Sequence, residues 1–197
     1  MRKPPLVFRH FADGDDNVNV KNVARLVEAL AKATAAKRDL IVLINSRGGN
    51  IEEFLKIEPI INTHKSRGLI FATAIYLDAY STGLNLAASG NFGYRVAIPE
   101  AKFQLHQASE VVRDMELKVE DYKAAARALD GTNRRLCKHL GRYTAITGDF
   151  WYKIIRDLPG ADDEFLFTAA DALHIGVIDE ISDAPLDTLI TRIQNRE

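Results

Sequence analysis

The run DLIVLIN, residues 39–45, restricts the fold more than any other feature of the sequence. Its apolar residues are consecutive, so a strand formed by them would be apolar on both faces. Such strands are typical of parallel sheets that helices cover on both sides. The run LIFATAIYL, residues 69–77, has the same character. We therefore expect a central sheet that is buried between two layers.

Strand-like and helix-like segments alternate along the rest of the chain, which predicts an α/β protein with a largely parallel sheet. Val20, Val23, Val27 and Leu30 recur at helical spacing, after Asp and Asn residues that can cap a helix. Pro59 is expected to kink or shorten a helix over residues 51–62. Further strands are expected at residues 6–11, 95–99, 101–107, 165–167 and 177–181, and further helices after Ser81, at 168–176 and at the C-terminus.

The longest helical pattern runs from about Met115 to Leu140, and Gly141 is expected to cap its end. One stripe on this helix is predicted to be core or a subunit interface rather than a cofactor site. The stripe comprises Tyr122, Ala125, Ala126 and Leu129.

Length and composition predict a single domain over residues 1–197, because no linker or repeat divides the chain. Lys and Arg number 26 and Asp and Glu 27, so the net charge of -1 predicts neither a nucleic-acid partner nor an anionic membrane surface. The single cysteine, Cys137, excludes an internal disulfide and favours a cytoplasmic location. No apolar run reaches the roughly 18 residues of a membrane span, and no histidine spacing is typical of a metal site. We expect no metal and no cofactor.

Three segments place polar groups or glycines where predicted strands end and helices begin, which is where functional groups gather in such sheets. The segment INSRGG ends a buried strand with Gly48 and Gly49, which can bring bare N–H groups close to a ligand. Ser81 stands at a strand-to-helix turn, and His106 ends the strand KFQLH. Together these residues indicate nucleophilic chemistry.

A serine hydroxyl needs an adjacent base, and the imidazole of His106 could accept the proton of Ser81 near neutral pH. The N–H groups of Gly49 and Thr82 could stabilise the oxyanion that forms when the hydroxyl attacks a carbonyl. The histidine also needs an acid to orient it, and Asp162, Asp163 and Glu164 are available before a short apolar strand. Two of these three carboxylates are expected to lie in a solvated loop. The order serine, histidine, acid differs from that of α/β-hydrolases and of chymotrypsin-like enzymes.

Four segments in order resemble the proteolytic subunit of the Clp (caseinolytic) serine peptidases, over about residues 6–181. These segments are INSRGGNI, AYSTGLNLAASG, RVAIPEAKFQLHQ and FTAADALHIGVIDEI. The resemblance implies a ClpP/crotonase-like fold of repeated strand-strand-helix units with a protruding handle helix. It also implies a serine endopeptidase with nucleophile Ser81 and base His106, acting on peptides or unfolded proteins as a homo-oligomeric ring.

The acid of the resembled family stands four residues before the Ser/Thr of the last segment, which selects Glu164. Matching Asp-x-Phe-Leu instead selects Asp163 and requires an inserted residue. Tyr80 and Asp78 differ from the family's residues beside the nucleophile, so a different substrate pocket is expected. Only residues 1–5 precede the first predicted strand, so an ATPase unfoldase partner is not assumed.

Two alternatives remain open at this point. The first is a crotonase-like acyl-CoA enzyme, which would use a carboxylate such as Glu52 or Glu53 but would leave Ser81 and His106 unexplained. The second is a catalytically inactive ring subunit, which would assemble without reacting with a serine-directed probe.

Overall fold

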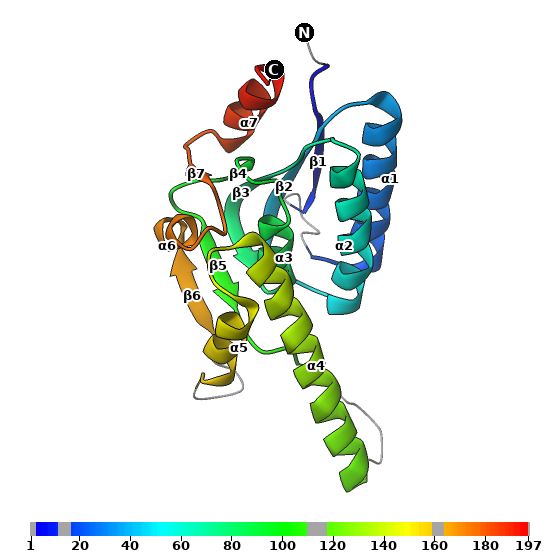
Figure 1. Cartoon of the computed structure of the whole chain (residues 1–197), viewed down its shortest axis with the longest axis vertical. Coiled ribbons are helices and arrows are strands. Elements are labelled where there is room, and N and C mark those ends of the chain that lie inside the picture. Colours follow the sequence, from blue (N-terminus) through cyan, green and yellow to red (C-terminus); the bar gives the residue numbers. More distant parts are fainter. Residues whose placement is uncertain (1–2, 12–16, 110–117, 159–163, 197) are drawn as a thin grey trace.

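A seven-stranded sheet forms the centre of the molecule (Figure 1). The computed structural model describes residues 3–11, 17–109, 118–158 and 164–196. The main path runs in the order β1-β2-β3-β4-β7, all in parallel. β5 also pairs in parallel with β3, and β6 pairs antiparallel with β5. The strands are β1 (Leu6–Phe11), β2 (Leu40–Ser46), β3 (Phe71–Tyr80), β4 (Arg95–Ala97), β5 (Lys102–Leu105), β6 (Phe165–Thr168) and β7 (Glu180–Ile181).

Both faces of this sheet are buried, as the apolar run in β2 predicted. Leu40 and Val42 belong to the larger core, whereas the alternate residues Ile41 and Leu43 belong to a smaller one. The helix α7 (Pro185–Gln194) contributes to the smaller core. The remaining helices pack mainly on the larger core and are α1 (Val20–Ala36), α2 (Ile51–Ser66), α3 (Thr82–Ala88), α4 (Val119–Tyr143), α5 (Gly148–Arg156) and α6 (Ala169–His174).

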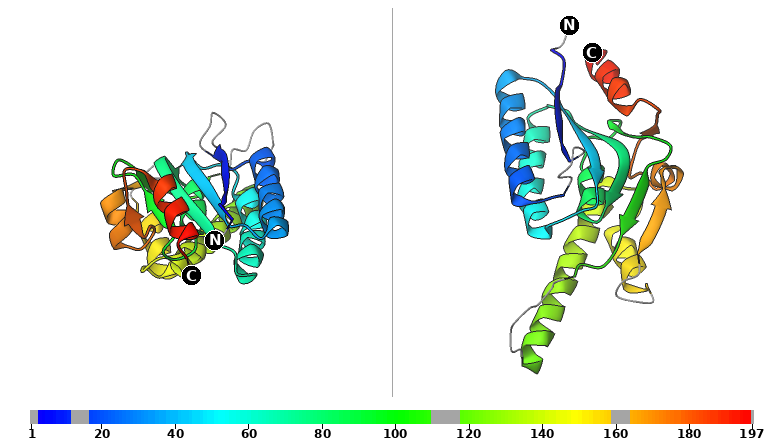
Figure 2. Two further views of the ribbon diagram at one scale, coloured as in Figure 1. Left: turned by 90° about the horizontal axis from the view of Figure 1, so that it is seen from above. Right: turned by 180° about the vertical axis from the view of Figure 1, so that it is seen from behind.

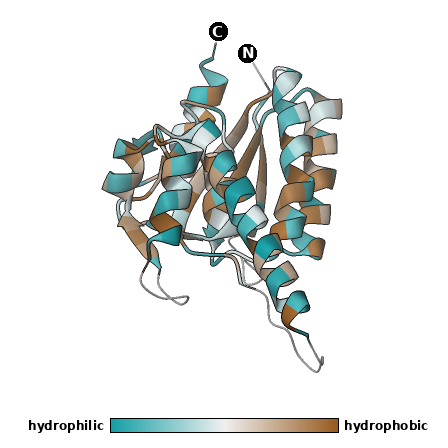
Figure 3. Cartoon of the chain, turned by 60° about the horizontal axis from the view of Figure 1, so that its bottom comes forward, coloured by the Kyte–Doolittle hydropathy of each residue, from teal (hydrophilic) through white to brown (hydrophobic). Residues whose placement is uncertain are grey.

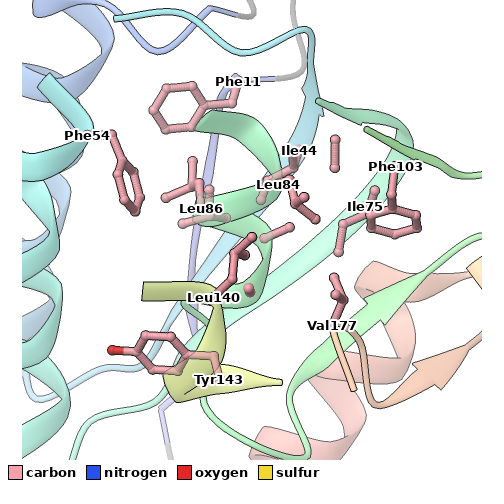
Figure 4. Packing of buried hydrophobic residues seen from close by; sticks show 14 of the residues in the cluster. Phe11, Ile44, Phe54, Ile75, Leu84, Leu86, Phe103, Leu140, Tyr143 and Val177 are labelled. Atoms are coloured by element: carbon pink, nitrogen blue, oxygen red, sulfur yellow. The ribbon is translucent and has the colours of Figure 1, made fainter. Parts of the chain in front are cut away.

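The short helix α3 lies at the centre of the larger core. Every residue of α3 is buried. Figure 4 shows Leu84 and Leu86 of α3 among Phe54 of α2, Leu140 of α4 and Phe11 of β1. The position of α3 therefore depends on the helices on either side of it.

Two helix boundaries predicted from the sequence are wrong. Pro59 does not shorten α2, which continues to Ser66 because Phe54, Ile57 and Ile61 anchor its buried face. Gly141 does not end α4, which continues to Tyr143. A side chain at Gly141 would collide with the backbone of Gly148, so this glycine serves the close packing of α4 on α5.

Two further elements differ from the prediction. β3 extends to Tyr80, beyond the predicted run of residues 69–77, although helix α3 begins at Thr82, directly after Ser81 as expected. The helix α5, residues 148–156, was not predicted at all, although it buries Trp151 and Ile155. The predicted start of the long helix near Met115 lies outside the described residues.

The N-terminal half of α4 projects from the body (Figure 2). Val119 is 69% and Tyr122 62% exposed, whereas Leu136 and Leu140 near the other end are buried. Figure 3 shows mixed hydrophilic and hydrophobic residues along the projecting half. The stripe predicted as core or interface is therefore not core within this chain, and the projecting half remains open to a partner.

Candidate active site

The turn between β3 and α3 holds Ser81 in a strained backbone conformation. Its φ of 54° and ψ of −120° lie where residues with a side chain are uncommon, and among the described non-glycine residues only Lys37 also has a positive φ. The conformation is held from both sides, because the Ser81 N–H donates to the Gln104 carbonyl (2.9 Å) and the Leu84 N–H donates to the Ser81 carbonyl (3.1 Å). Such strain costs about 1–3 kcal/mol and is concentrated at functional sites.

The hydroxyl of Ser81 makes no hydrogen bond with the described part of the chain. A serine that precedes a helix usually accepts a hydrogen bond from a backbone N–H of the first turn, but Ser81 does not cap α3 in this way. The residue is only half-buried. Its hydroxyl is therefore free to react.

Gly48 brings the turn after β2 against Ser81. A Cβ at Gly48 would lie 2.7 Å from the Ser81 Cβ and 2.9 Å from the Tyr80 carbonyl oxygen, and the φ of Gly48 is +104°. Only glycine fits both the space and the conformation. The N–H of Gly48 is used internally, since it donates to Ser46 Oγ (3.2 Å). The backbone that continues into Gly49 thus passes directly beside the candidate nucleophile.

The N–H groups of Gly49 and Thr82 have no acceptor among the described residues. Gly49 is fixed by its neighbours, because the Val18 N–H donates to the Gly48 carbonyl (2.8 Å) and the Asn50 N–H to the Val18 carbonyl (2.7 Å). Thr82 is the first residue of α3, where backbone N–H groups lack helical partners. Both N–H groups are therefore available as donors, and their role as the oxyanion donors remains a prediction.

His106 follows the last residue of β5, the strand next to β3. The pairing of Tyr80 with Gln104 places the start of α3 and the end of β5 side by side. The side chain of His106 is half-buried, and no hydrogen bond joins it to Ser81 in the described structure. The fold brings the two segments together, but the Ser81–His106 contact remains a prediction.

The antiparallel ladder between β5 and β6 bears on the choice of acid. Leu105 pairs with Phe165, so the next position of the same ladder places His106 opposite Glu164. Residues directly opposite in a ladder share one face of the sheet. Glu164 is exposed, whereas Asp162 and Asp163 lie outside the described residues. The register favours Glu164, and the identity of the acid remains a prediction.

Charged and phenolic side chains surround the turn. Arg47 Nε lies 3.9 Å from Asp78 Oδ2, and the guanidinium is largely exposed. Burial raises the pKa of Tyr80 above its usual value, and a hydrogen bond to Asp78 and the negative charge of Glu164 raise it further. Tyr80 therefore lies near both carboxylates. The sequence analysis identified Tyr80 and Asp78 as unusual residues beside Ser81. It did not identify Arg47 as the ion-pair partner of Asp78.

A groove of about 580 Å³ begins at Gly49 and runs between α2 and α4. Sequence reasoning missed this groove, because its walls on α2 and α4 are more than 70 residues apart in the chain and only the fold brings them together. Its lining includes Gly49, Ile51, Glu52, Leu55, Leu129 and Arg135.

Two other kinds of site have no support in the described part of the chain. Among those residues, no group of three His, Cys, Asp or Glu side chains could hold a metal ion. None of the described helices combines the length and the apolar character that crossing a membrane requires.

The sequence of this chain matches a known protein family. The model of the family described as Clp protease matches residues 12–185. The chain is 29% identical over 149 residues to the ATP-dependent Clp protease proteolytic subunit 1 of Rhodococcus jostii, covering 73% of this chain and 60% of that protein. It is also 29% identical to subunit 1 of Streptomyces coelicolor (85% of this chain, 69% of that protein) and 28% identical to subunit 2 of Corynebacterium diphtheriae (86% and 78%).

Proposed function

Because the chain belongs to the Clp protease family, we propose that it is a serine endopeptidase that hydrolyses peptide bonds through an acyl-enzyme. The observation that supports the proposal is the strained turn at Ser81, which lies against Gly48 and beside the end of β5 and whose hydroxyl has no partner among the described residues. The proposed substrates are peptides or unfolded proteins. An ATPase partner is not part of the proposal.

In the proposed mechanism, Ser81 Oγ attacks the carbonyl carbon of the scissile peptide bond while His106 accepts its proton. The N–H groups of Gly49 and Thr82 stabilise the resulting oxyanion, at about 3 kcal/mol for each donor. The C–N bond then breaks as His106 protonates the departing amine. Water, deprotonated by His106, then attacks the acyl ester. The ester bond to Ser81 breaks, and His106 returns the proton to Ser81 Oγ.

Glu164 is our preferred acid for orienting His106, and Asp163 is the alternative. The register between β5 and β6 supports Glu164, since one further step of the ladder beyond Leu105 and Phe165 would set Glu164 opposite His106. An acid in this position accepts the second ring N–H and stabilises the imidazolium that forms during turnover.

We also propose that the chain assembles into a homo-oligomeric ring. The exposed half of α4, which includes Val119 and Tyr122, is available for contacts between copies. The missing Ser81–His106 hydrogen bond does not contradict the proposed chemistry, because catalytic contacts without substrate are often loose and tighten in the Michaelis complex.

Peptide turnover tests the proposal directly. Wild-type protein, Ser81→Ala and Ser66→Ala are compared on a set of fluorogenic peptides. Ser66 is exposed and its hydroxyl bonds only the Thr63 carbonyl, so it is a matched control. We expect turnover by wild type and Ser66→Ala and none by Ser81→Ala. Turnover that persists in Ser81→Ala rejects Ser81 as the nucleophile.

A crotonase-like acyl-CoA enzyme is the second candidate. The observation in its favour is Glu52, a carboxylate that lines the groove next to Gly49. Glu53, by contrast, is buried and paired with Lys56 at 2.5 Å, so it is not free to react. Acyl-CoA binding measured by calorimetry, together with no peptide turnover, would favour this candidate. Ring assembly with neither activity would instead identify an inactive ring subunit.

A further inference from the structure

A second set of serine, histidine and carboxylate lies at the other end of α3. Nε2 of His139 is 3.1 Å from Ser89 Oγ and 3.1 Å from the Asn85 carbonyl oxygen. Nδ1 of His139 is 2.9 Å from Glu58 Oε1. The ring is fully buried, and its partners come from α2 and α3 while His139 itself belongs to α4.

The hydrogen positions in this cluster follow from its acceptors. A carbonyl oxygen can only accept, and the hydroxyl proton of Ser89 is given to the same Asn85 carbonyl at 2.8 Å. In this arrangement a proton on Nε2 of His139 points at two acceptors, Ser89 Oγ and the Asn85 carbonyl oxygen.

The other ring nitrogen faces a carboxylate. Glu58 Oε1 also accepts from Arg142 NH1 at 2.9 Å, and the pKa of Glu58 is lowered chiefly by His139. An ionised carboxylate has only acceptors, so a proton on Nδ1 of His139 would face an acceptor as well. Nδ1 lies within ion-pair distance of Glu58 but makes no well-aligned hydrogen bond. A ring with both nitrogens protonated is an imidazolium cation.

The cluster cannot act as a second hydrolytic site. Ser89 is 1% exposed, so no substrate reaches its hydroxyl. Its backbone N–H donates to the Asn85 carbonyl at 3.1 Å, so it offers no oxyanion donor. The role of this cluster is therefore to hold structure.

α3 needs such a support, because a helix of seven residues is not stable by itself. Its N-terminal end is held by the Ser81 N–H to Gln104 hydrogen bond, and its C-terminal end by the His139 cluster. Since a helix is rigid over this length of about 10 Å, fixing one end sets the position of the other. The Thr82 N–H and Ser81 are thus placed by contacts at Asn85 and Ser89.

We propose that His139 is a buried imidazolium that pins α3 between α2 and α4 and so acts as a positioning residue for Ser81. The effect on Ser81 rests on the proposed peptidase function, whereas the charge of His139 and its anchoring of α3 do not. His106 and His139 therefore have different tasks at opposite ends of one helix.

Other titratable groups also face the cluster. Arg142 and Tyr143 contribute from α4, and Glu58 and Lys65 from α2. Lys65 Nζ donates to the Ser89 carbonyl at 2.9 Å, and burial lowers the pKa of Lys65 to about 8. An alkaline loss of activity could therefore arise from Lys65, so the test must observe the His139 ring itself.

Nitrogen NMR of the histidine rings at pH 7 tests the charge. The His139 signals are assigned by their loss in His139→Gln. We expect both ring nitrogens of His139 to be protonated in wild type, and one of them to lose its proton in Glu58→Gln. A ring with one bare nitrogen in wild-type protein overturns the proposal.

Amide hydrogen exchange tests the pin, with His64→Gln as the matched control. His64 is also buried, but its Nδ1 pairs with Thr34 Oγ1 at 3.1 Å and joins α1 to α2 instead of holding α3. Relative to β2, α3 should exchange faster in His139→Gln and not in His64→Gln. Equal α3 exchange in the two variants overturns the pin. Should His139→Gln fail to fold, Glu58→Gln supplies the exchange comparison.

The rate at which a fluorophosphonate labels Ser81 tests the positioning role. We expect labelling to slow by about 10- to 100-fold in folded His139→Gln or Glu58→Gln and to be unchanged in His64→Gln, since a shift of about 1 Å can cost that much. An unchanged rate in both variants overturns the positioning role. Absence of labelling in wild type refutes the proposed function instead. In that case NMR still tests the charge of His139, and hydrogen exchange still tests whether His139 anchors α3.

Discussion

The serines at the two ends of α3 are in opposite states. At the N-terminal end, the hydroxyl of Ser81 is free and half-exposed, and the neighbouring N–H groups lack acceptors. At the C-terminal end, Ser89, His139 and Glu58 are close together and Ser89 and His139 are buried. The serine–histidine contact that the structure shows is thus the one that no substrate can reach.

This difference shows that distances between a serine, a histidine and an acid do not identify a hydrolytic site by themselves. Catalysis requires groups whose hydrogen bonding is left unfinished until a substrate binds. Stability requires that buried groups be satisfied. Ser81, on its strained backbone, fits the requirement for catalysis, and the cluster around His139 fits the requirement for stability.

Replacing the proposed base gives the largest expected effect. His106→Gln should lower peptide turnover by about 10⁴-fold, because a serine hydroxyl is a weak nucleophile without its adjacent base. His174→Gln, which changes an exposed histidine, is the control and should leave turnover unchanged. The rate of peptide cleavage is measured under single-turnover conditions. Similar rates for the two variants would remove His106 from the mechanism.

Adding a methyl group at Gly48 should lower turnover by about 10²-fold, because it would push against Ser81 and misplace the hydroxyl. Gly68→Ala provides the matched control. Gly68 also has a positive φ of +79°, but a Cβ there meets nothing within 4 Å. Both variants store backbone strain, so only the difference between them reports the contact with Ser81. Equal turnover would show that Gly48 has no part in the site.

The choice of acid can be made by a pair of variants. Glu164→Gln should lower turnover by about 10²-fold, less than the loss of a buried triad carboxylate, because Glu164 is exposed and screened by solvent. Asp163→Asn should have little effect. The reverse result would transfer the role to Asp163.

The smallest expected effect concerns stability at the closed end of α3. The pKa of Glu58 is lowered in the folded state, so its contribution to the free energy of unfolding is present above the unfolded pKa of about 4.5 and is lost as pH falls through the folded pKa. Glu58→Gln should therefore be less stable than wild type near neutral pH and should lose less stability on acidification below about pH 5. Urea denaturation at several pH values measures this, and parallel curves for the two proteins contradict it.

The buried sheet could be predicted because consecutive apolar residues, as in 40–44, leave a strand no polar face. The approach of Ser81, Gly48 and the end of β5 followed from the rule that parallel strands end at one edge. Helix α5 was missed because a helix of nine residues depends on tertiary contacts, here the burial of Trp151. The His139 cluster could not be foreseen, since Ser89 is 50 residues away in the chain.

The boundary errors have a different cause. A glycine after a helical pattern can either cap the helix or allow close packing. At Gly141 the backbone of Gly148 leaves no room for a side chain, so the glycine serves packing. A proline inside a helix removes one hydrogen bond, but the buried residues of α2 on either side of Pro59 compensate for that loss. Both outcomes depend on tertiary neighbours.

The measurement that tests the central claim most directly is the site of fluorophosphonate modification, mapped by mass spectrometry of the assembled wild-type protein. The account predicts one modified residue, Ser81, with Ser89 unmodified, and no labelling of Ser81→Ala. Labelling that survives in Ser81→Ala, or that occurs at Ser89, would contradict it.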